Sequence, residues 1–318
     1  MDIQKATELS HRVLDELRKV VVGQDGVIAH MMAAILAGGH ALLEGVPGTA
    51  KTLIARSLSA VVGVAFKRIQ LTPDLMPSDI IGVSIYNTAT AEFVFRPGPI
   101  FADLVLADEI NRPPAKTQAA LLEAMQERQA TVDGKTHPLS AVFTVFATQN
   151  PVEFEGTYPL PEAEVDRFML KILIDYPAEG TEAEILDKVH AGFDAGDLTT
   201  AHLQPVLDLE ALSQIRAVTR GLHVEQDVRR YITQIIRATR TMPQVSLGAS
   251  PRAGVMLMLA AKAAAVLAGR QFVTPDDVKA MAGAALRHRI ILHPEYEVEG
   301  RTADDCINEL LTGIEVPR

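Results

Sequence analysis

The clearest chemistry in the sequence belongs to the lysine and threonine that end the loop Gly45-Val46-Pro47-Gly48-Thr49-Ala50-Lys51-Thr52. An apolar run at residues 41–43 precedes the loop, and apolar residues at helical spacing, beginning at Leu53, follow it. Strand, glycine-containing loop and helix in this order are the setting of a phosphate-binding loop. The glycines let backbone N–H groups turn toward an anion, and the first helical turn adds unpaired donors. We expect Lys51 to bind phosphate oxygens and the Thr52 hydroxyl to bind Mg²⁺.

Ala50 departs from the general pattern of these loops, which has glycine at the sixth position. If Ala50 has helical φ and ψ angles, its Cβ is tolerated and the departure weakens the match more than the chemistry. The alternative interpretation is a glycine- and proline-containing turn before an amphipathic helix, with an incidental Lys-Thr pair.

Two carboxylates, Asp108 and Glu109, end a second apolar run at residues 104–107. Carboxylates at the end of a buried strand are costly unless they hold a charge or remain in water. Beside a phosphate-binding loop, Asp108 would support Mg²⁺ and Glu109 would orient and deprotonate an attacking water. The alternative interpretation is a solvated strand end, which would be the preferred one if the Asp-Glu pair stood alone, without the phosphate-binding loop.

A third apolar run, at residues 141–147, leads to Asn150. The runs at 65–71 and 169–174 complete a set of predicted strands, with helical segments at 3–20, 26–37 and 113–127 around them. In a parallel sheet with helical crossovers, the carboxyl ends of the strands share one edge. We therefore expect the glycine loop, the Asp-Glu pair and Asn150 to converge.

Two further segments have both a structural and a functional interpretation. Val22, Gly23 and Gln24 are either a turn between helices or one wall of an adenine pocket, which apolar side chains and backbone amides suit. Ser250-Pro251-Arg252 starts a helix, and a cation is unfavourable there unless it faces an anion. Arg252 is therefore either a simple exposed arginine or a ligand of bound phosphate.

Composition and length predict an ordinary globular chain with two domains. Its 318 residues are 48% hydrophobic and 22% charged, and the net charge of −10 argues against nucleic acid as the main partner. The single cysteine, Cys306, the absence of a signal-peptide pattern, and the shortness of the apolar stretch at 255–268 favour a cytoplasmic location and no membrane span.

The organisation changes near Pro177, where strand patterns give way to alanine-rich helical ones. We predict an α/β nucleotide-binding core at 1–177, a linker region with a helix at 178–207 and an all-helical domain at 208–318. Within the core, a loop with two prolines spans 72–79, and two β-hairpins turn at 87–91 and at Asp133-Gly134. The later helices are predicted at 182–191, 209–218, 227–240, 252–268 and 275–288, with a polar linker at 192–205.

In combination, four motifs resemble the MoxR family of AAA+ ATPases: GVPGTAKT at 45–52, VLADEINR at 105–112, ATQNP at 147–151 and LPEAEVDRF at 160–168. The resemblance covers nearly the whole chain, and Ala50 is the residue that this family uses. It implies an AAA+ parallel-sheet P-loop core with a C-terminal all-α lid. It also implies that the two hairpins are the helix-2 and pre-sensor-1 insertions of the clade that contains MoxR.

The resemblance also implies roles for individual residues. Asp108 and Glu109 correspond to Walker B, Asn150 to sensor 1, Arg167 to an arginine finger that completes the neighbouring subunit's site, and Arg252 to sensor 2. The implied nucleotide-binding residues are Val22, Gly23, Gln24, Gly45, Val46, Pro47, Gly48, Thr49, Ala50, Lys51, Thr52, Leu53 and Asp108, with Thr52 and Asp108 holding Mg²⁺.

For the whole molecule, the resemblance implies an ATP-hydrolysing ring, usually a hexamer. Such a ring acts as a chaperone-like remodeller or assembly factor for protein substrates, frequently those with von Willebrand factor A domains. Two other functions stay open. One is a nucleotide-gated binding switch with slow turnover, against which Glu109 and Asn150 argue. The other is a nucleic-acid motor, against which the negative net charge argues.

Overall fold

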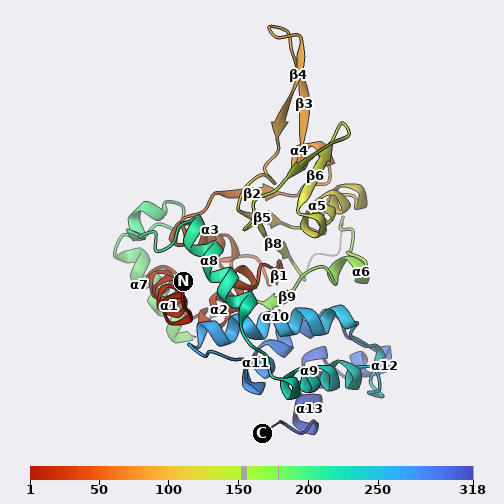
Figure 1. Ribbon diagram of the computed structural model, residues 1–318. Coiled ribbons are helices and arrows are strands. Elements are labelled where there is room, and N and C mark those ends of the chain that lie inside the picture. Colours follow the sequence, from red (N-terminus) through yellow and green to blue (C-terminus); the bar gives the residue numbers. More distant parts are fainter. Residues whose placement is uncertain (152–155, 178, 318) are drawn as a thin grey trace.

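A five-stranded parallel sheet lies at the centre of the computed structural model, which describes residues 1–151, 156–177 and 179–317. The strand order is β2-β5-β8-β1-β9 (Figure 1). Its strands are β1 (Ala41–Glu44), β2 (Phe66–Gln70), β5 (Leu104–Asp108), β8 (Thr144–Gln149) and β9 (Leu170–Leu173). All five predicted core strands are therefore present, and their carboxyl ends share one edge.

Both faces of this sheet are covered, which explains why its strands read as apolar runs rather than as alternating patterns. Successive side chains of a strand point to opposite faces. In β5, Leu104 and Leu106 belong to one hydrophobic cluster, whereas Val105 and Ala107 belong to the other. The first cluster holds side chains from α1 (Ile3–Arg18), α2 (Asp25–Ala37) and α3 (Lys51–Val62), and the second holds α5 (Ala115–Glu127).

Two antiparallel hairpins leave this core, as predicted. β3 (Gly82–Asn87) pairs with β4 (Glu92–Pro97), and together they project far beyond the rest of the molecule (Figure 1). β6 (Gln129–Val132) pairs with β7 (Lys135–Pro138), and Asp133 and Gly134 have the positive φ angles, 49° and 75°, that suit a two-residue hairpin turn. The predicted loop at 72–79 is partly wrong, because α4 (Pro77–Ile81) begins inside it and Asp79 caps the backbone N–H of Met76.

The C-terminal part is mainly helical. Its predicted helices are present as α7 (Glu179–His190), α8 (Leu209–Gly221), α9 (Gln226–Thr239), α10 (Pro251–Leu267) and α11 (Pro275–Leu286). The sequence did not predict the short β10 (Val245–Leu247) and β11 (Ile291–Leu292), which pair with each other, nor α12 (Pro294–Val298) and α13 (Ala303–Gly313). The core also contains the short α6 (Glu162–Val165), and the predicted linker contains the 3-10 helix η1 (Leu198–Ala201).

The C-terminal helices pack directly on the core, and one hydrophobic cluster runs through both. α10 lies against α2, and α11 lies against β9. The predicted boundary at 177/178 falls at residue 178, which lies outside the described residues. Within the described part of the chain, no helix combines the length and apolar character needed to cross a membrane.

Candidate functional site

The predicted phosphate-binding residues lie around one cavity of about 320 Å³ at the carboxyl edge of the sheet. It brings Lys51 and Thr52 together with Asp108, Glu109 and Asn150, although β1 and β8 lie about a hundred residues apart in the sequence. The other lining residues are Pro47, Gly48, Thr49, Ala50, Leu53, Arg68, Gln70, Thr148 and Gln149. The convergence expected from parallel topology is therefore present.

The backbone conformation of the loop requires glycine at two positions, and at a third, Ala50, a residue with a Cβ has a left-handed conformation. A Cβ on Gly45 would lie 2.4 Å from the carbonyl oxygen of Ile174, so only glycine fits there. Gly48 has φ +86°, a conformation that side chains with a Cβ rarely adopt. Ala50 has φ 62° and ψ 17°. The condition under which its Cβ would be tolerated, right-handed helical φ and ψ angles, is therefore not met. Ala50 is left-handed, and α3 begins only at Lys51.

Lys51 points its ammonium group into the turn of the loop. Nζ donates to the carbonyl oxygens of Gly45 and Val46 at 2.6 and 2.7 Å, and it lies 3.4 Å from the Thr49 hydroxyl. Burial lowers the pKa of Lys51, while the carboxylates of Asp108 and Glu109 act in the opposite direction. The Lys51 ammonium group is therefore bound by neutral carbonyl oxygens. An anion in the loop would form a stronger, charge-assisted hydrogen bond with it.

The two Walker B carboxylates have separate partners. Asp108 is buried at the end of β5, where it accepts from Arg68 Nε at 2.5 Å and from the Thr148 hydroxyl at 3.1 Å. Glu109 follows with φ 61°, and its Oε2 lies 3.0 Å from Gln70 Nε2 and 3.1 Å from Arg112 Nε. Glu109 is therefore in a left-handed conformation directly after β5, and its carboxylate has partners different from those of Asp108.

The neighbours of these carboxylates were not found by sequence reasoning. Arg68 and Gln70 lie on β2, the strand next to β5, at positions paired with Leu106 and Asp108. The strand order that brings them there is not encoded in any local motif. The sequence placed Thr148 at the end of a predicted strand, but it did not indicate the hydrogen bond from Thr148 to Asp108.

A second cavity, of about 300 Å³, adjoins the first and has a mainly apolar lining. Both cavities include Gly48, Thr49, Ala50 and Leu53, so they meet at the glycine loop. Val22 and Gln24 lie in its wall, and Gln24 Nε2 donates to the backbone oxygen of Asp175 at 3.1 Å. The rest of the wall is formed by Val20, Val21, Pro177, Ile185, Lys188, Val189, Phe193 and Ala195.

Gly23 lies behind this wall rather than in it. A Cβ at Gly23 would come within 2.5 Å of the Thr181 side chain, and its φ is +70°. Gly23 therefore allows α7 to approach the segment that carries Val22 and Gln24. The sequence did not indicate the contribution of α7 and Phe193, because their apolar residues are compatible with any packed helix.

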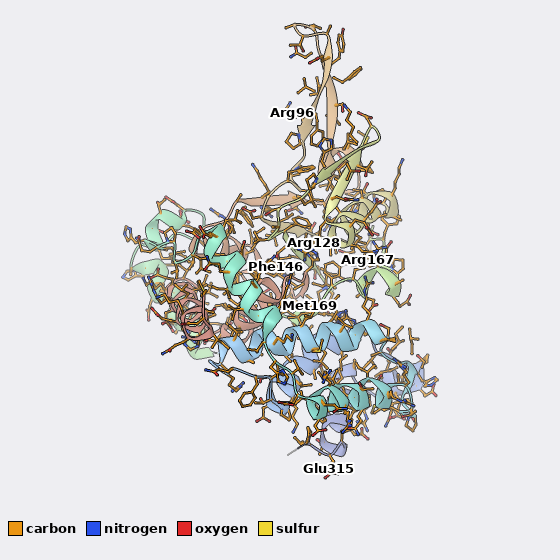
Figure 2. The ribbon with its side chains drawn as sticks, in the orientation of Figure 1. Arg96, Arg128, Phe146, Arg167, Met169 and Glu315 are labelled. Atoms are coloured by element: carbon orange, nitrogen blue, oxygen red, sulfur yellow. The ribbon has the colours of Figure 1, made fainter. Side chains whose placement is uncertain are left out.

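Arg167 and Arg252 are not brought to the glycine loop of the same chain. Together they line another cavity, of about 310 Å³, between the sheet and α10. Figure 2 shows Arg167 on the segment after α6, above α10. Arg252 therefore lines the same cavity as Arg167 and does not line the cavity at the glycine loop.

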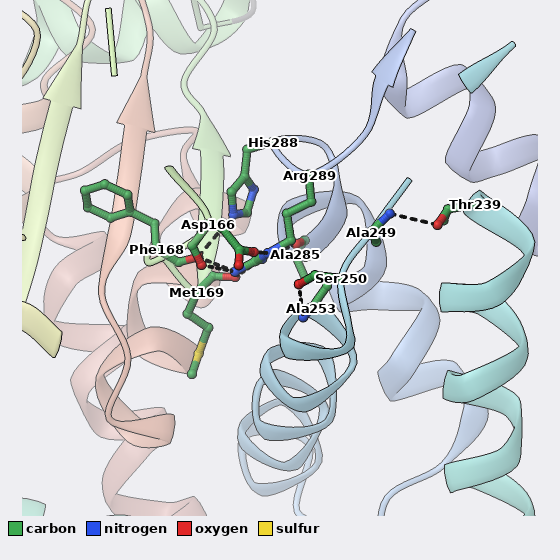
Figure 3. Close-up of polar contacts among 10 residues, drawn as sticks. All are labelled: Asp166, Phe168, Met169, Thr239, Ala249, Ser250, Ala253, Ala285, His288 and Arg289. Carbon is green, nitrogen blue, oxygen red and sulfur yellow. Dashed lines mark hydrogen bonds and ion pairs between the residues drawn. The ribbon is translucent and has the colours of Figure 1, made fainter. Parts of the chain in front are cut away.

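A buried arginine fixes the segment that carries Arg167 (Figure 3). Arg289, just after α11, pairs through Nε with Asp166 Oδ1 at 2.6 Å. Its other nitrogens donate to the backbone oxygens of Asp166, Phe168, Met169 and Ala285. Burial lowers the pKa of Arg289, although its bond to Asp166 acts against this. The helical part of the chain therefore sets the position of the residues on either side of Arg167.

The donor groups fit a purine nucleotide and Mg²⁺. The apolar cavity matches a planar base, and the cavity with Lys51 and the amides of the loop matches phosphates. Mg²⁺ prefers oxygen ligands and retains several waters, and the Asp108 carboxylate and the Thr52 hydroxyl that line this cavity are groups of that kind.

Comparison with known proteins agrees with this geometry. Residues 40–170 match the ATPase family associated with various cellular activities (AAA), and residues 237–310 match the AAA lid domain. The uncharacterized protein YeaC of Bacillus subtilis is 45% identical over 96% of this chain and 94% of its own length. Chaperone MoxR1 of Mycobacterium tuberculosis is 40% identical, over 96% of this chain and 82% of its own.

Protein MoxR of Methylorubrum extorquens is 30% identical over 95% of this chain and 93% of its own length. A crystal structure of a candidate ATPase from Cytophaga hutchinsonii superimposes with a TM-score of 0.90 at 41% identity, covering 99% of this chain and 97% of that one. These relatives span the core and the lid alike, and on that basis the chain belongs to the MoxR family of AAA+ ATPases.

Proposed function

We propose that this chain binds and hydrolyses ATP with Mg²⁺ and, as a ring of identical subunits, uses the hydrolysis to remodel or assemble partner proteins. The observation that carries the proposal is the pair of adjoining cavities, one polar and one apolar, that share Gly48, Thr49, Ala50 and Leu53. A nucleotide requires this combination, since its base is apolar and planar and its phosphates are charged.

In the proposed site each residue has one task. Lys51 and the loop amides neutralise phosphate oxygens, and Thr52 and Asp108 hold Mg²⁺, which supplies charge neutralisation at the phosphates when it is bound. The Glu109 carboxylate takes the proton of the attacking water, and Asn150 orients that water. Gln70 and Arg112 keep the Glu109 carboxylate in place.

Ring formation would explain why the two proposed catalytic arginines lie apart from the loop. Arg167 and Arg252 share a cavity with each other and none with Lys51. We propose that both act on the nucleotide of a neighbouring subunit. This step does not depend on the number of subunits, because any closed ring brings one subunit's arginines to the next subunit's loop.

Protein partners are the proposed substrates, with von Willebrand factor A domain proteins as candidates from the family resemblance. Two of the relatives are named as chaperone or MoxR proteins. The β3–β4 hairpin offers a contact surface, because it carries exposed apolar side chains such as Phe93, which is 70% exposed, and Tyr86 and Val94 beside it. A cytoplasmic location and a hexameric ring belong to the same proposal.

The proposal is tested by measuring ATP binding and phosphate release for the unsubstituted chain, Glu109→Gln and Glu123→Gln, the last being an exposed glutamate on α5. Glu109→Gln should bind ATP normally and hydrolyse it about 10²–10⁴-fold more slowly, since the amide accepts no proton. Glu123→Gln should match the unsubstituted chain. If the unsubstituted chain is no faster than Glu109→Gln, the slow-switch alternative replaces the enzyme.

A further inference from the structure

Four arginines line the cavity between the sheet and α10, and no carboxylate lines it. They are Arg128 at the end of α5, Arg167, Arg220 near the end of α8 and Arg252 at the start of α10. Within the described part of the chain, none of the four forms an ion pair with an Asp or Glu. Arginines that lack an ion pair rarely cluster around a cavity unless an anion neutralises their charge.

Three cationic groups lie close together beside Gly38, which lines the cavity. A Cβ built on Gly38 would lie 3.5 Å from Arg220 Nη2, 3.6 Å from Arg128 Nη2 and 3.7 Å from Arg216 Nη1. Three guanidinium groups from α5 and α8 therefore surround one point beside a glycine, and no other non-neighbouring atom lies closer to it.

Arg216 is the buried member of this group, with only 4% of its surface exposed. Its Nη2 donates to the Thr144 hydroxyl at 2.7 Å, and its Nη1 lies 3.3 Å from the Ala141 oxygen, which Arg128 Nη1 also approaches at 3.4 Å. Its Nε has no hydrogen-bond partner in the described structure. This buried guanidinium therefore has an unused donor, lies beside two more cations and forms no ion pair with a carboxylate in the described part of the chain.

The local electrostatics agree with this description. Burial, followed by Arg128 and Arg220, lowers the pKa of Arg216 to about 9. His40, which also lines the cavity, is buried; burial and then Arg128 lower its pKa to about 3, so it is neutral at physiological pH. Asp103 acts on the pKa of Arg216 in the opposite direction, but it does not line the cavity, so the charged side chains of the lining are all cationic.

We propose that this cavity is a second anion site, separate from the glycine loop, in which Arg128 and Arg220 bind a phosphate group beside Gly38 and the buried Arg216 adds positive charge behind them. Phosphate matches the geometry, because guanidinium groups form paired, charge-assisted hydrogen bonds to its oxygens. A volume of about 310 Å³ admits inorganic phosphate or pyrophosphate. The bound anion would connect α5 and α8 and stabilise the contact between the core and the C-terminal helices.

The phosphate group has two possible sources, free phosphate from solution or the nucleotide of a neighbouring subunit, and the test separates them. The first arm uses Lys51→Ala protein, which lacks the cation of the glycine loop, so the inference does not depend on hydrolysis. Inorganic phosphate and pyrophosphate are added at constant ionic strength, with chloride as the reference. Hydrogen exchange is followed in peptides covering residues 37–40 and 209–221, together with the melting temperature.

The matched variants are Arg220→Glu and Arg12→Glu in the same background, since both arginines are exposed on helices. Arg220→Glu supplies the missing carboxylate. Without phosphate, it should melt at or above the temperature of Arg12→Glu, because it removes repulsion and adds a partner for Arg216. Arg220→Glu should bind phosphate at least tenfold more weakly than Arg12→Glu, because an anionic side chain then occupies the site.

The second arm mixes isotope-labelled Lys51→Ala chains with Glu109→Gln chains loaded with ATP. Protection of residues 37–40 and 209–221 by free phosphate, lost in Arg220→Glu, supports the solution source. Protection that arises only in the loaded mixture, and is lost in the labelled Arg220→Glu chain, supports the neighbouring nucleotide. Absence of Arg220-dependent protection in both arms overturns the site, whatever the ATPase assay shows.

Discussion

At the scale of single residues, the left-handed conformation of Ala50 has a measurable consequence. A residue with a Cβ at φ 62° is less stable than glycine by about 1–2 kcal/mol. Ala50→Gly should therefore raise the free energy of unfolding by about 0.5–1 kcal/mol, after subtracting the larger entropy of unfolded glycine. Denaturant unfolding without nucleotide provides the measurement.

The matched control is Ala60→Gly, an exposed position in the right-handed part of α3. Here glycine should lower stability by about 0.5–1 kcal/mol, so the two substitutions have opposite signs. A loss of stability in Ala50→Gly equal to that in Ala60→Gly would show that the left-handed angle stores no strain.

At the scale of helices and strands, His40 joins three elements in a neutral form. Val145 N–H donates to its Nδ1 at 2.9 Å, and its Nε2 donates to the Met125 oxygen at 3.1 Å. Its pKa falls from 6.5 to about 3 on folding, mainly through burial. Between these values the unfolded chain binds more protons than the folded one. This contribution is therefore complete above pH 6.5 and decreases as pH falls, by up to about 1.4 kcal/mol per pH unit.

We expect His40→Gln to reduce the slope of stability against pH between 6.5 and 4, compared with His190→Gln, an exposed histidine at the end of α7. Burial also lowers the pKa values of His30 and His288, and these two histidines should contribute to the slope that remains. Chemical unfolding at a series of pH values tests this. Equal slopes in the two variants would contradict the assignment to His40.

Arg289 gives a prediction about the connection between α11 and the segment around Arg167. Arg289→Leu leaves the Asp166 carboxylate without its partner and removes the donors to four backbone oxygens, those of Asp166, Phe168, Met169 and Ala285. We expect a loss of about 3–5 kcal/mol, typical of a broken buried ion pair. Arg301→Leu breaks the exposed pair with Glu309 and should lose at most about 1 kcal/mol. Similar losses in the two variants would mean that Arg289 does not anchor this segment.

The elements also show what the sequence could and could not predict. The convergence of Lys51, Asp108 and Asn150 was predictable, because parallel strands place their carboxyl ends on one edge. The neighbours Arg68 and Gln70 were not, since they depend on the order β2-β5. β10 and β11 are too short to show a periodicity, whereas α13 begins with a capping box, Thr302 with Asp305, that could have been found.

At the scale of the whole molecule, packing decides where the two proposed catalytic arginines lie. Arg252 starts α10 as predicted, but sequence cannot tell against which part of the core that helix packs. In the structure it shares a cavity with Arg167, away from Lys51. Each chain thus presents a glycine loop at one place and a pair of arginines at another, which is the arrangement that a head-to-tail ring can use.

Mixed rings test whether Arg167 acts on the neighbouring subunit. Arg167→Ala alone should assemble, bind ATP and hydrolyse it about 10³–10⁵-fold more slowly, by analogy with other arginine fingers. Lys51→Ala alone should be inactive because its own phosphate site lacks its cation. When the two are mixed, the intact loop of an Arg167→Ala subunit can receive the arginine of a Lys51→Ala neighbour, and partial ATPase activity should return. As a control, Lys51→Ala mixed with a Lys51→Ala/Arg167→Ala double variant should remain inactive. Mixed rings verified by mass spectrometry that show no recovery would mean that Arg167 serves its own subunit or is only structural.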